Sequence, residues 1–377
     1  MVGAKVLPFA SLRRVRLLWQ TDVQRLSLAE LKSMGTAKSD REVLQTARRT
    51  HKELKVRIAH RLQDFLFLPY MAAANPSVQA LHEKYVGAYM LHEEINQLDT
   101  VDKANQYWSV LASIFEDHQN VTRLLGHSRR QLVRLDPELA PTIDAFFDRF
   151  FVSRISTHLL GANFLQHWPM AQGRKKPAGV AMGVLQPTSP AAFVRDFTTT
   201  TFLPAGRNVT VQVEDDADVS ILYIPGHLRT IVREVLQNAV AATARVARER
   251  GAEPPPVRVK LHRGQFGMFV TVSDRGGGID HMDHVWRWGK EEGPPADGAA
   301  EWPDADEETD VEPTDVEGKR GLPLGFGLPL ARLTARYFGG DMRLQTLVGS
   351  GTSAYIHIPE LQEVGSGGSD TNEGIFF

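Results

Sequence analysis

The chain has 377 residues, which is enough for two domains. Hydrophobic residues make up 42% of it, as in ordinary globular proteins, and the net charge of −2 gives no electrostatic reason to expect nucleic acid as a partner. The chain has no cysteine, which excludes disulfides, zinc fingers and thiol catalysis and fits a reducing compartment. No apolar run reaches the roughly 18 residues that a transmembrane helix needs, so no membrane span is expected.

The N-terminal segment is basic. Up to Thr21 it carries Lys5 and several arginines among leucines, and it contains no acidic residue. This composition is typical of a mitochondrial transit peptide, although a merely basic tail would have the same pattern. We therefore predict that residues 1–39 are a transit peptide and an N-terminal arm.

The pattern from about residue 40 to residue 172 is helical. Apolar residues recur every three or four positions in 53–65 and in 104–130. Helix breaks are expected near Asp99 and at three proline dipeptides, Asn75-Pro76, Asp136-Pro137 and Trp168-Pro169. These breaks predict about four long helices over 40–172, packed as an antiparallel bundle.

Strands and helices mix after Gly173. Apolar or β-branched runs predict strands at 180–185, 209–213, 220–224, 257–261, 269–272, 342–347 and 354–358, and helices near 191–202, 226–250 and 328–338. The segment from Gly264 to Gly267 predicts a hairpin turn. The mixture predicts an α+β sandwich over residues 173–361.

Two segments have little that could pack. Residues 289–322 are rich in Asp, Glu, Pro and Gly, and an insert this long inside a domain often acts as a mobile lid over a site. The insert lacks the spacing of an EF-hand, so we expect no calcium site there. The tail, residues 362–377, is rich in Gly and Ser and is predicted to be disordered.

Glu234 and Asn238 are four residues apart in the predicted helix 226–250, so they share one face of it. A carboxylate beside an amide can accept a proton and help to bind Mg²⁺, two tasks that phosphoryl transfer needs. By itself such a pair is usually only a solvated helix face. The segments that follow it make it informative.

The first such segment is Asp274-Arg-Gly276-Gly-Gly278, directly after a strand. Its glycines let the backbone turn tightly and approach a ligand, and Asp274 can accept a hydrogen bond from an amine such as that of adenine. The second is Gly325-Phe326-Gly327-Leu328, which opens a helix and offers free N–H groups to phosphate.

The third segment is Gly349-Ser-Gly-Thr352, between two strands, where a hydroxyl could reach a phosphate. Each segment alone could be an ordinary turn. Together, in this order and with the acidic insert between the first two, they predict a nucleotide site.

The order Glu-x-x-x-Asn, Asp-x-Gly-x-Gly, insert, Gly-x-Gly-Leu-Pro and Gly-x-Gly-Thr resembles the GHKL ATP-binding domain. Histidine kinases, Hsp90 chaperones, type II topoisomerases and mismatch-repair ATPases share that domain. Within this group the chain is most similar to the mitochondrial 2-oxo-acid dehydrogenase kinases. The similarity extends into the helical half, at residues 53–59, 117–121 and 147–156.

The resemblance implies an ATP-dependent protein serine kinase of the mitochondrial matrix, which inactivates the decarboxylase component of a 2-oxo-acid dehydrogenase complex. Its cofactors would be ATP and Mg²⁺. It would dock on the lipoyl domain of the acyltransferase core and form a homodimer. The pyruvate complex is the favoured substrate, and the branched-chain complex is the alternative.

The resemblance also implies a role for each site residue. Glu234 would be the general base, Asn238 would hold the Mg²⁺ that bridges the ATP phosphates, and Asp274 would bind adenine. The remaining positions would support the nucleotide and the lid: Gly276, Gly278, Gly325, Phe326, Gly327, Leu328 and Thr352.

The chain departs from the pyruvate-type pattern at several positions. Thr230 stands where those kinases have a histidine, and Phe115 and His158 replace arginines of a pocket for small carboxylates. His118 and Arg154 remain and are candidate regulatory residues. Two other functions stay open: a nucleotide-binding scaffold without catalysis, and a sensor-type histidine kinase with its phosphoacceptor at His51.

Overall fold

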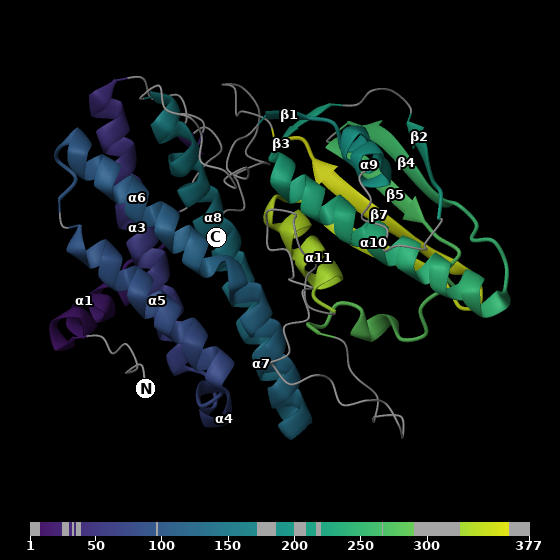
Figure 1. The fold of residues 1–377 in the computed structure, drawn as a ribbon, viewed down its shortest axis with the longest axis horizontal. Helices are drawn as coiled ribbons and strands as arrows, with labels where there is room; N and C mark the ends of the chain where they lie inside the picture. The colour runs from purple at the N-terminus through teal and green to yellow at the C-terminus, as the bar shows by residue number, and fades with distance from the viewer. Residues whose placement is uncertain are drawn as a thin grey trace.

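The computed structural model of the chain describes residues 8–24, 30–31, 34, 39–95, 97–171, 186–199, 209–215, 220–265, 267–289 and 325–361. The predicted lid beyond Gly289, the predicted tail 362–377 and the predicted strand 180–185 therefore lie outside the described residues. A helical half is followed by a half that mixes strands and helices, as the sequence predicts (Figure 1).

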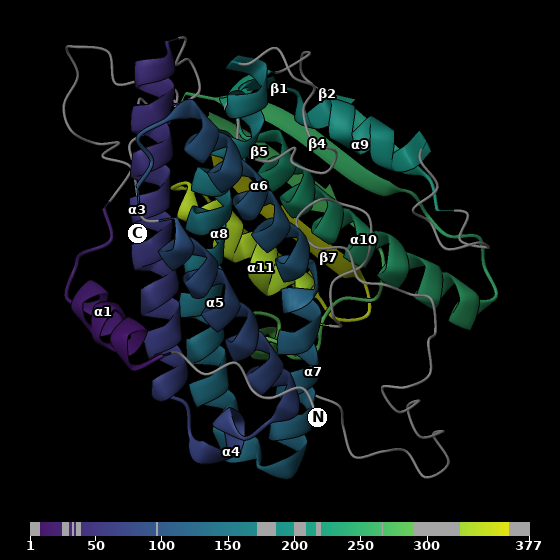
Figure 2. The same ribbon diagram turned by 60° about the vertical axis from the view of Figure 1, so that its left-hand side comes forward.

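The helical half packs its helices side by side (Figures 1 and 2). They are α1 (Phe9–Trp19), α3 (Asp40–Leu66), α4 (Tyr70–Ala73), α5 (Pro76–Glu94), α6 (Val101–Asp117), α7 (Val121–Leu135) and α8 (Ala140–Ala171), with the short 3-10 turns η1 (His118–Asn120) and η2 (Pro137–Leu139). Polar side chains cap the N-termini of α3, α5 and α6. Ser39 forms a capping box with Glu42, and the side chains of Asn75 and Thr100 accept from the first N–H groups of α5 and α6.

The predicted helix over 104–130 is two helices, because the chain breaks at η1. Two basic side chains donate hydrogen bonds to backbone carbonyl oxygens at this break. Lys84 donates to the carbonyl of Asp117 at 2.7 Å, and Arg154 donates to the carbonyl of His118 at 3.0 Å. Tertiary contacts thus add to the hydrogen bonding of the backbone at this break, which no local pattern would indicate.

The predicted end of the last bundle helix at Trp168-Pro169 is wrong, since α8 continues to Ala171. Pro169 has no N–H to donate to the carbonyl of Leu165, four residues earlier. The indole of Trp108 donates to that carbonyl instead, at 3.1 Å. This replacement contact lets the helix pass the proline.

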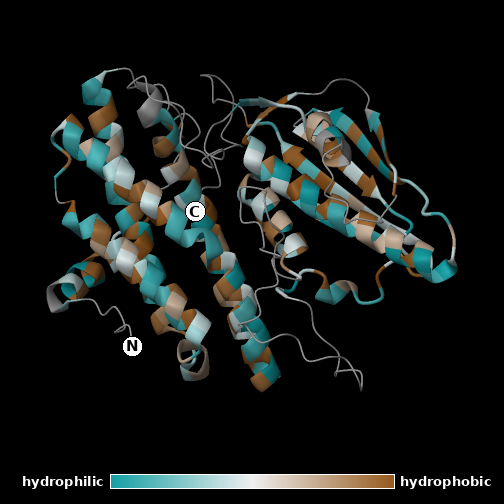
Figure 3. Ribbon diagram, in the orientation of Figure 1, coloured by the Kyte–Doolittle hydropathy of each residue, from teal (hydrophilic) through white to brown (hydrophobic). Residues whose placement is uncertain are grey.

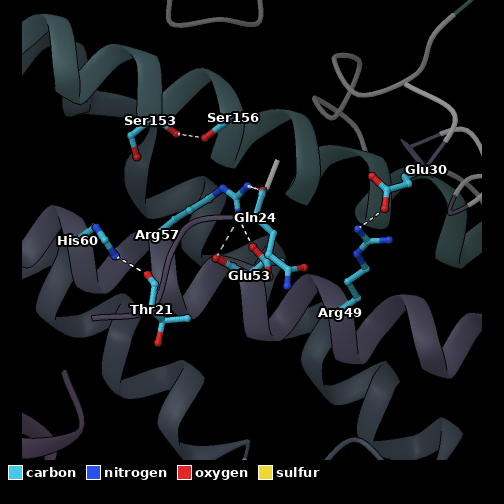
Figure 4. A network of polar contacts seen from close by, with 9 residues as sticks. All are labelled: Thr21, Gln24, Glu30, Arg49, Glu53, Arg57, His60, Ser153 and Ser156. Carbon is cyan, nitrogen blue, oxygen red and sulfur yellow. Dashed lines mark hydrogen bonds and ion pairs between the residues drawn. The ribbon is translucent and has the colours of Figure 1, made fainter. Parts of the chain in front are cut away.

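The N-terminal arm is bound to α3. Val15 is buried, and the indole of Trp19 donates to the carbonyl of Ala59 at 2.9 Å. Figure 4 shows the buried Arg57, which pairs with Glu53 at 2.7 Å and donates to the backbone oxygen of Gln24 at 2.9 Å. The segment predicted as part of a transit peptide is therefore packed against the bundle wherever it is described.

The second half contains a five-stranded sheet in the order β2-β4-β5-β7-β6. The strands are β2 (Val211–Asp215), β4 (Val257–Gly264), β5 (Gly267–Ser273), β6 (Asp341–Leu347) and β7 (Gly351–Pro359). β2 and β4 are parallel, and the other neighbours are antiparallel. Two further strands, β1 (Gln186–Thr188) and β3 (Ile221–Tyr223), form a separate antiparallel pair.

Helices α9 (Pro190–Thr199), α10 (Pro225–Arg250) and α11 (Gly327–Tyr337) lie on one face of the sheet (Figure 1). Strand residues alternate accordingly, with Val257, Val259 and Leu261 of β4 buried. Figure 3 shows this alternation as brown and teal segments along the strands. The other face carries Phe269 and Tyr355, which are 45% and 44% exposed. None of the described helices combines the length and apolarity that crossing a bilayer requires.

An aromatic cluster joins the two halves. Phe147 and Phe151 of α8 pack with Trp288 and Phe326, which precede and follow the acidic insert. Trp288 and Phe326 are 2% and 1% exposed, and their rings are 5.3 Å apart. The indole of Trp288 also donates to Asp148 at 2.8 Å. Both ends of the insert are thus anchored against the bundle.

Candidate nucleotide and phosphoryl-transfer site

Helix α10 places Glu234 and Asn238 on one face, as predicted from their spacing. The helix begins at Pro225, which suits a first helical position, and ends at Gly251, whose φ of 61° is left-handed. Its apolar residues pack on the sheet, so its length and direction are determined by the core. The site is therefore built on a rigid element.

Glu234 is only 5% exposed. Its carboxylate lies against the start of α11, because a Cβ added to Gly327 would be 2.5 Å from Oε2. Glycine at position 327 is what allows this approach. Burial raises the pKa of Glu234 above its usual value, and the adjacent Arg233 opposes the rise. A carboxylate with a raised pKa is a better proton acceptor at neutral pH than an exposed one.

Asn238 is exposed, one turn further along α10. Its side-chain amide nitrogen donates to the backbone carbonyl of Glu234 at 2.8 Å. This contact turns the amide oxygen outward, where it can bind a cation. No three acidic or histidine side chains gather as a metal site within the described ranges. The donor set therefore fits a Mg²⁺ that takes its other ligands from phosphates and water.

Asp274 closes the other end of the site. Its Oδ1 accepts from the N–H groups of Gly276 at 2.8 Å and Thr352 at 3.2 Å, which leaves Oδ2 for a ligand. Burial raises the pKa of Asp274, and the two N–H contacts oppose the rise. The hydroxyl of Thr352 lies 3.2 Å from that of Thr346, beside Asp274. Thr352 therefore supports the proposed adenine end of the site rather than a phosphate.

The glycines of this loop are required by close contacts. A Cβ on Gly276 would clash with the Cβ of Ala242 on α10 and lie 2.8 Å from the carbonyl carbon of Ala242. Gly278 has a φ of 79°, and a Cβ there would be 2.5 Å from the carbonyl oxygen of Leu347. The loop after β5 is thus seated directly on α10.

We expect Gly276→Ala to weaken ATP binding by tenfold or more, because the loop must move off α10 and carry Asp274 with it. Isothermal titration calorimetry with ATP and Mg²⁺ measures this. Ala242→Gly in the same chain should recover part of the loss by removing the nearest clashing atom. Gly251→Ala is the control for a general loss of stability: its φ of 61° also disfavours alanine, but its Cβ would meet nothing within 4 Å, so ATP affinity should not change. Unchanged ATP affinity in Gly276→Ala would contradict the loop's role.

The second predicted segment, Gly325 to Leu328, is divided between two environments. Gly325 has a φ of 83°, and its carbonyl accepts from the N–H of Gly289 at 3.1 Å. Gly327 faces Glu234, and Leu328 is partly buried in the first turn of α11. Phe326 instead points into the aromatic cluster between the halves. It anchors the segment, and Gly327 directly after it faces Glu234.

The candidate regulatory residues lie together in the bundle. His118 packs on Tyr85, with ring centroids 4.9 Å apart, and Arg154 donates to its backbone carbonyl. Burial, and then the charge of Arg154, lower the pKa of His118 to about 4. A cavity of about 20 Å³ lies beside them, lined also by Phe115 and His158. His118 is therefore neutral at physiological pH.

His51, the candidate phosphoacceptor, is half-buried on α3. Its Nε2 is 2.8 Å from the carbonyl oxygen of His92, and its ring packs against His92 and Tyr107. A histidine that accepts a phosphoryl group must reach the nucleotide, and this one is held inside the bundle. The contacts weigh against the histidine-kinase alternative.

Sequence reasoning missed Arg233 and Trp288. Arg233 contacts the carboxylate of Glu234 although the two residues are adjacent in the helix, where side chains usually diverge. Trp288 packs between the halves just before the acidic insert. The two tryptophans Trp286 and Trp288, directly before a long polar segment, were the one signal that could have suggested an anchor.

Two family descriptions match the chain. The description "Mitochondrial branched-chain alpha-ketoacid dehydrogenase kinase" matches residues 25–184. The description "Histidine kinase-, DNA gyrase B-, and HSP90-like ATPase" matches residues 224–362. The two matches correspond to the helical half and to the half that holds the candidate site.

Known kinases match nearly the whole chain. It is 26% identical over 346 residues to the mitochondrial pyruvate dehydrogenase (acetyl-transferring) kinase of Arabidopsis thaliana, covering 89% of this chain and 90% of that protein. It is 26% identical over 329 residues to the mitochondrial isozyme 3 of Homo sapiens, covering 82% and 77%. It is likewise 26% identical over 331 residues to the mitochondrial isozyme 1 of Rattus norvegicus, covering 82% and 71%. The chain is therefore similar over both halves to the mitochondrial 2-oxo-acid dehydrogenase kinases, and its second half has an ATPase domain of the GHKL type.

Proposed function

We propose that this protein transfers the γ-phosphoryl group of ATP to a serine of a 2-oxo-acid dehydrogenase decarboxylase component. One observation carries this proposal. Glu234, Asn238 and Ala242 are spaced four residues apart on α10. Glu234 contacts the start of α11, Asn238 is exposed to solvent, and Ala242 contacts the Asp274 loop. The span is roughly 12 Å along the helix axis, which suits an extended nucleotide lying along this face.

The residues have distinct tasks in this reaction. Glu234 accepts the proton of the serine hydroxyl as its oxygen attacks the γ-phosphorus, and ADP leaves. Asn238 would hold Mg²⁺ through its amide oxygen, and the metal would offset the charge of the phosphates. Asp274 accepts from the adenine amine, which sets the direction of the nucleotide. The free N–H groups at the start of α11 face the phosphates.

We propose the pyruvate complex as the substrate, because the relatives that match nearly the whole chain are named pyruvate dehydrogenase kinases. The branched-chain complex is the second candidate, since the description that matches the helical half names it. By the same family relationship, we propose the mitochondrial matrix as the location and the lipoyl domain as a docking partner. We also propose a homodimer.

The decisive experiment incubates the protein with Mg-ATP and each purified decarboxylase component side by side. We expect phosphoserine on the pyruvate component and loss of its decarboxylase activity. Phosphoserine only on the branched-chain component would reverse the choice of substrate. ATP binding without phosphoserine on either component would support the scaffold alternative. Acid-labile phosphate on the protein itself would support the histidine-kinase alternative.

We expect Asn238→Ala to abolish measurable Mg-ATP binding, because it removes the one amide oxygen that this face of α10 offers to the metal. Calorimetry with ATP in the presence and absence of Mg²⁺ measures the loss. Gln237→Ala, at the neighbouring half-buried position, is the control and should bind normally. If Asn238→Ala keeps its Mg²⁺-dependent affinity, the metal is held elsewhere.

A further inference from the structure

The carboxylate of Glu234 is held by the residue directly before it. The Nε and Nη2 atoms of Arg233 lie 3.2 and 2.9 Å from Oε1 of Glu234. Both residues are buried, with Arg233 7% exposed. Neighbouring residues on a helix normally point in different directions, so the long arginine side chain must fold back to reach its neighbour. The contact is a feature of tertiary packing rather than of helical spacing.

This contact leaves the two carboxylate oxygens in different positions. Oε1 is shared by two guanidinium nitrogens, whereas Oε2 lies against Gly327 at the start of α11. The phosphates and the serine hydroxyl are expected at that helix start. The oxygen that faces the reacting groups is therefore the one that Arg233 leaves free.

Thr230 does not share this task. Its hydroxyl, one turn before the base, donates to the backbone carbonyl of Gly226 at 3.0 Å. Among the described residues, Arg233 is the one whose side chain donates to the carboxylate of Glu234. The position one turn earlier therefore does not orient the proposed base in this chain.

We propose that Arg233 is a positioning residue for phosphoryl transfer, which fixes the carboxylate of Glu234 with Oε2 toward the substrate. This proposal rests on the proposed function and deepens it. Arg233 need not touch ATP or serine, since it acts through Glu234. A charge-assisted hydrogen bond of this kind is stronger than a neutral one and fixes geometry as well as charge.

The surroundings favour this pairing. Arg233 lines a cavity of about 30 Å³ between the two halves, and Arg154 of α8 lines it too. His158 of α8 and His227 of α10 also face it, and burial lowers the pKa of both. The α11 residues that line the cavity are Leu330 and Thr334, which carry no charge. Glu234 is thus the anionic partner of Arg233. The positive charge of Arg154 disfavours movement of the Arg233 guanidinium away from Glu234 and into the cavity.

The test compares Arg233→Met and Arg233→Lys with the wild type in full-length protein. We expect Arg233→Met to lower kcat about tenfold or more at pH 7 while the KM for ATP changes little. The acidic limb of its kcat profile should move to higher pH, because the buried carboxylate has lost its cation. Arg233→Lys should restore the limb but only part of kcat, since it keeps the charge without the two-nitrogen contact.

Arg229→Met is the matched control. Arg229 is exposed one turn earlier on the same helix, where its guanidinium lies over the ring of Phe193. We expect its kcat profile to match the wild type. An Arg233→Met profile with the wild-type acidic limb would overturn the proposal, and so would equal losses in Arg233→Met and Arg229→Met.

A stability measurement separates this proposal from the proposed function. In urea unfolding, the midpoint shift of the Arg233→Met, Glu234→Gln double variant should be smaller than the sum of the two single shifts. Additive shifts would overturn the pairing whatever the activity. Coupled shifts in a protein that phosphorylates neither decarboxylase component would refute the proposed function and the positioning role that rests on it. In that case only the pairing of Arg233 with Glu234 would be supported.

Discussion

Replacing Glu234 with glutamine is expected to lower phosphoryl transfer by roughly 10²–10⁴-fold, the usual contribution of a general base. The substitution keeps the shape of the side chain and removes its ability to accept a proton. The nucleotide contacts of Asn238 and Asp274 lie one or more helical turns away and remain. ATP affinity should therefore change little, and the loss should fall on kcat.

Single-turnover phosphorylation measures the chemical step, and calorimetry measures ATP affinity in the same preparation. The control is Glu249→Gln, because Glu249 lies exposed near the end of the same helix and pairs with the exposed Arg245. Wild-type turnover in Glu234→Gln would refute the assignment of the base. It would leave the family relationship intact, since that relationship does not depend on this residue.

Lowering the pH from 7 to 5 is expected to remove roughly 5 kcal/mol from the free energy of unfolding. Three buried histidines account for that figure, and His158, whose pKa burial also lowers, adds to it. Burial lowers the pKa of His92 to about 3 and those of His118 and His227 to about 4. The folded state keeps these rings neutral, whereas the unfolded chain binds a proton to each below about pH 6.5. Their contribution to stability is therefore present above that pH and is lost as the pH falls toward 4.

This loss is large beside a typical net stability of about 5–15 kcal/mol, so unfolding in mild acid is expected. Urea midpoints between pH 7.5 and 5 measure the effect, and the slope reports the protons taken up on unfolding. His227→Gln should reduce that slope by about one proton. His281→Gln, at an exposed position, should leave it unchanged. A midpoint that does not fall between pH 7 and 5 would rule out this mechanism.

Local patterns predicted the elements that carry the site. The Glu234–Asn238 spacing placed both residues on one face of α10, and strand alternation placed the Asp274 loop after β5. Such periodicities are properties of neighbouring residues, so a sequence displays them directly. Gly276 was predicted to let the backbone approach a ligand and Gly327 to offer N–H groups to phosphate. The close contacts that both make with α10 were not predicted.

Contacts between distant segments could not be predicted in the same way. The break at η1 depends on Lys84 and Arg154, and the passage of α8 through Pro169 depends on Trp108. Phe326 lies between two glycines of a nucleotide motif, yet its ring packs on α8. In each case the deciding partner is remote in the chain, and only the folded structure brings the two together.

The anchoring of Trp288 and Phe326 has a consequence for how this protein can vary. The N–H of Gly289 donates to the carbonyl of Gly325, so the chain leaves and re-enters the domain at nearly the same point. The entropic cost of closing a flexible loop grows only with the logarithm of its length. Doubling the length lowers the free energy of unfolding by about 0.6 kcal/mol. On that scale, the closure of the chain between Gly289 and Gly325 depends little on how many residues separate them. This junction is a natural place to graft a reporter or a foreign peptide.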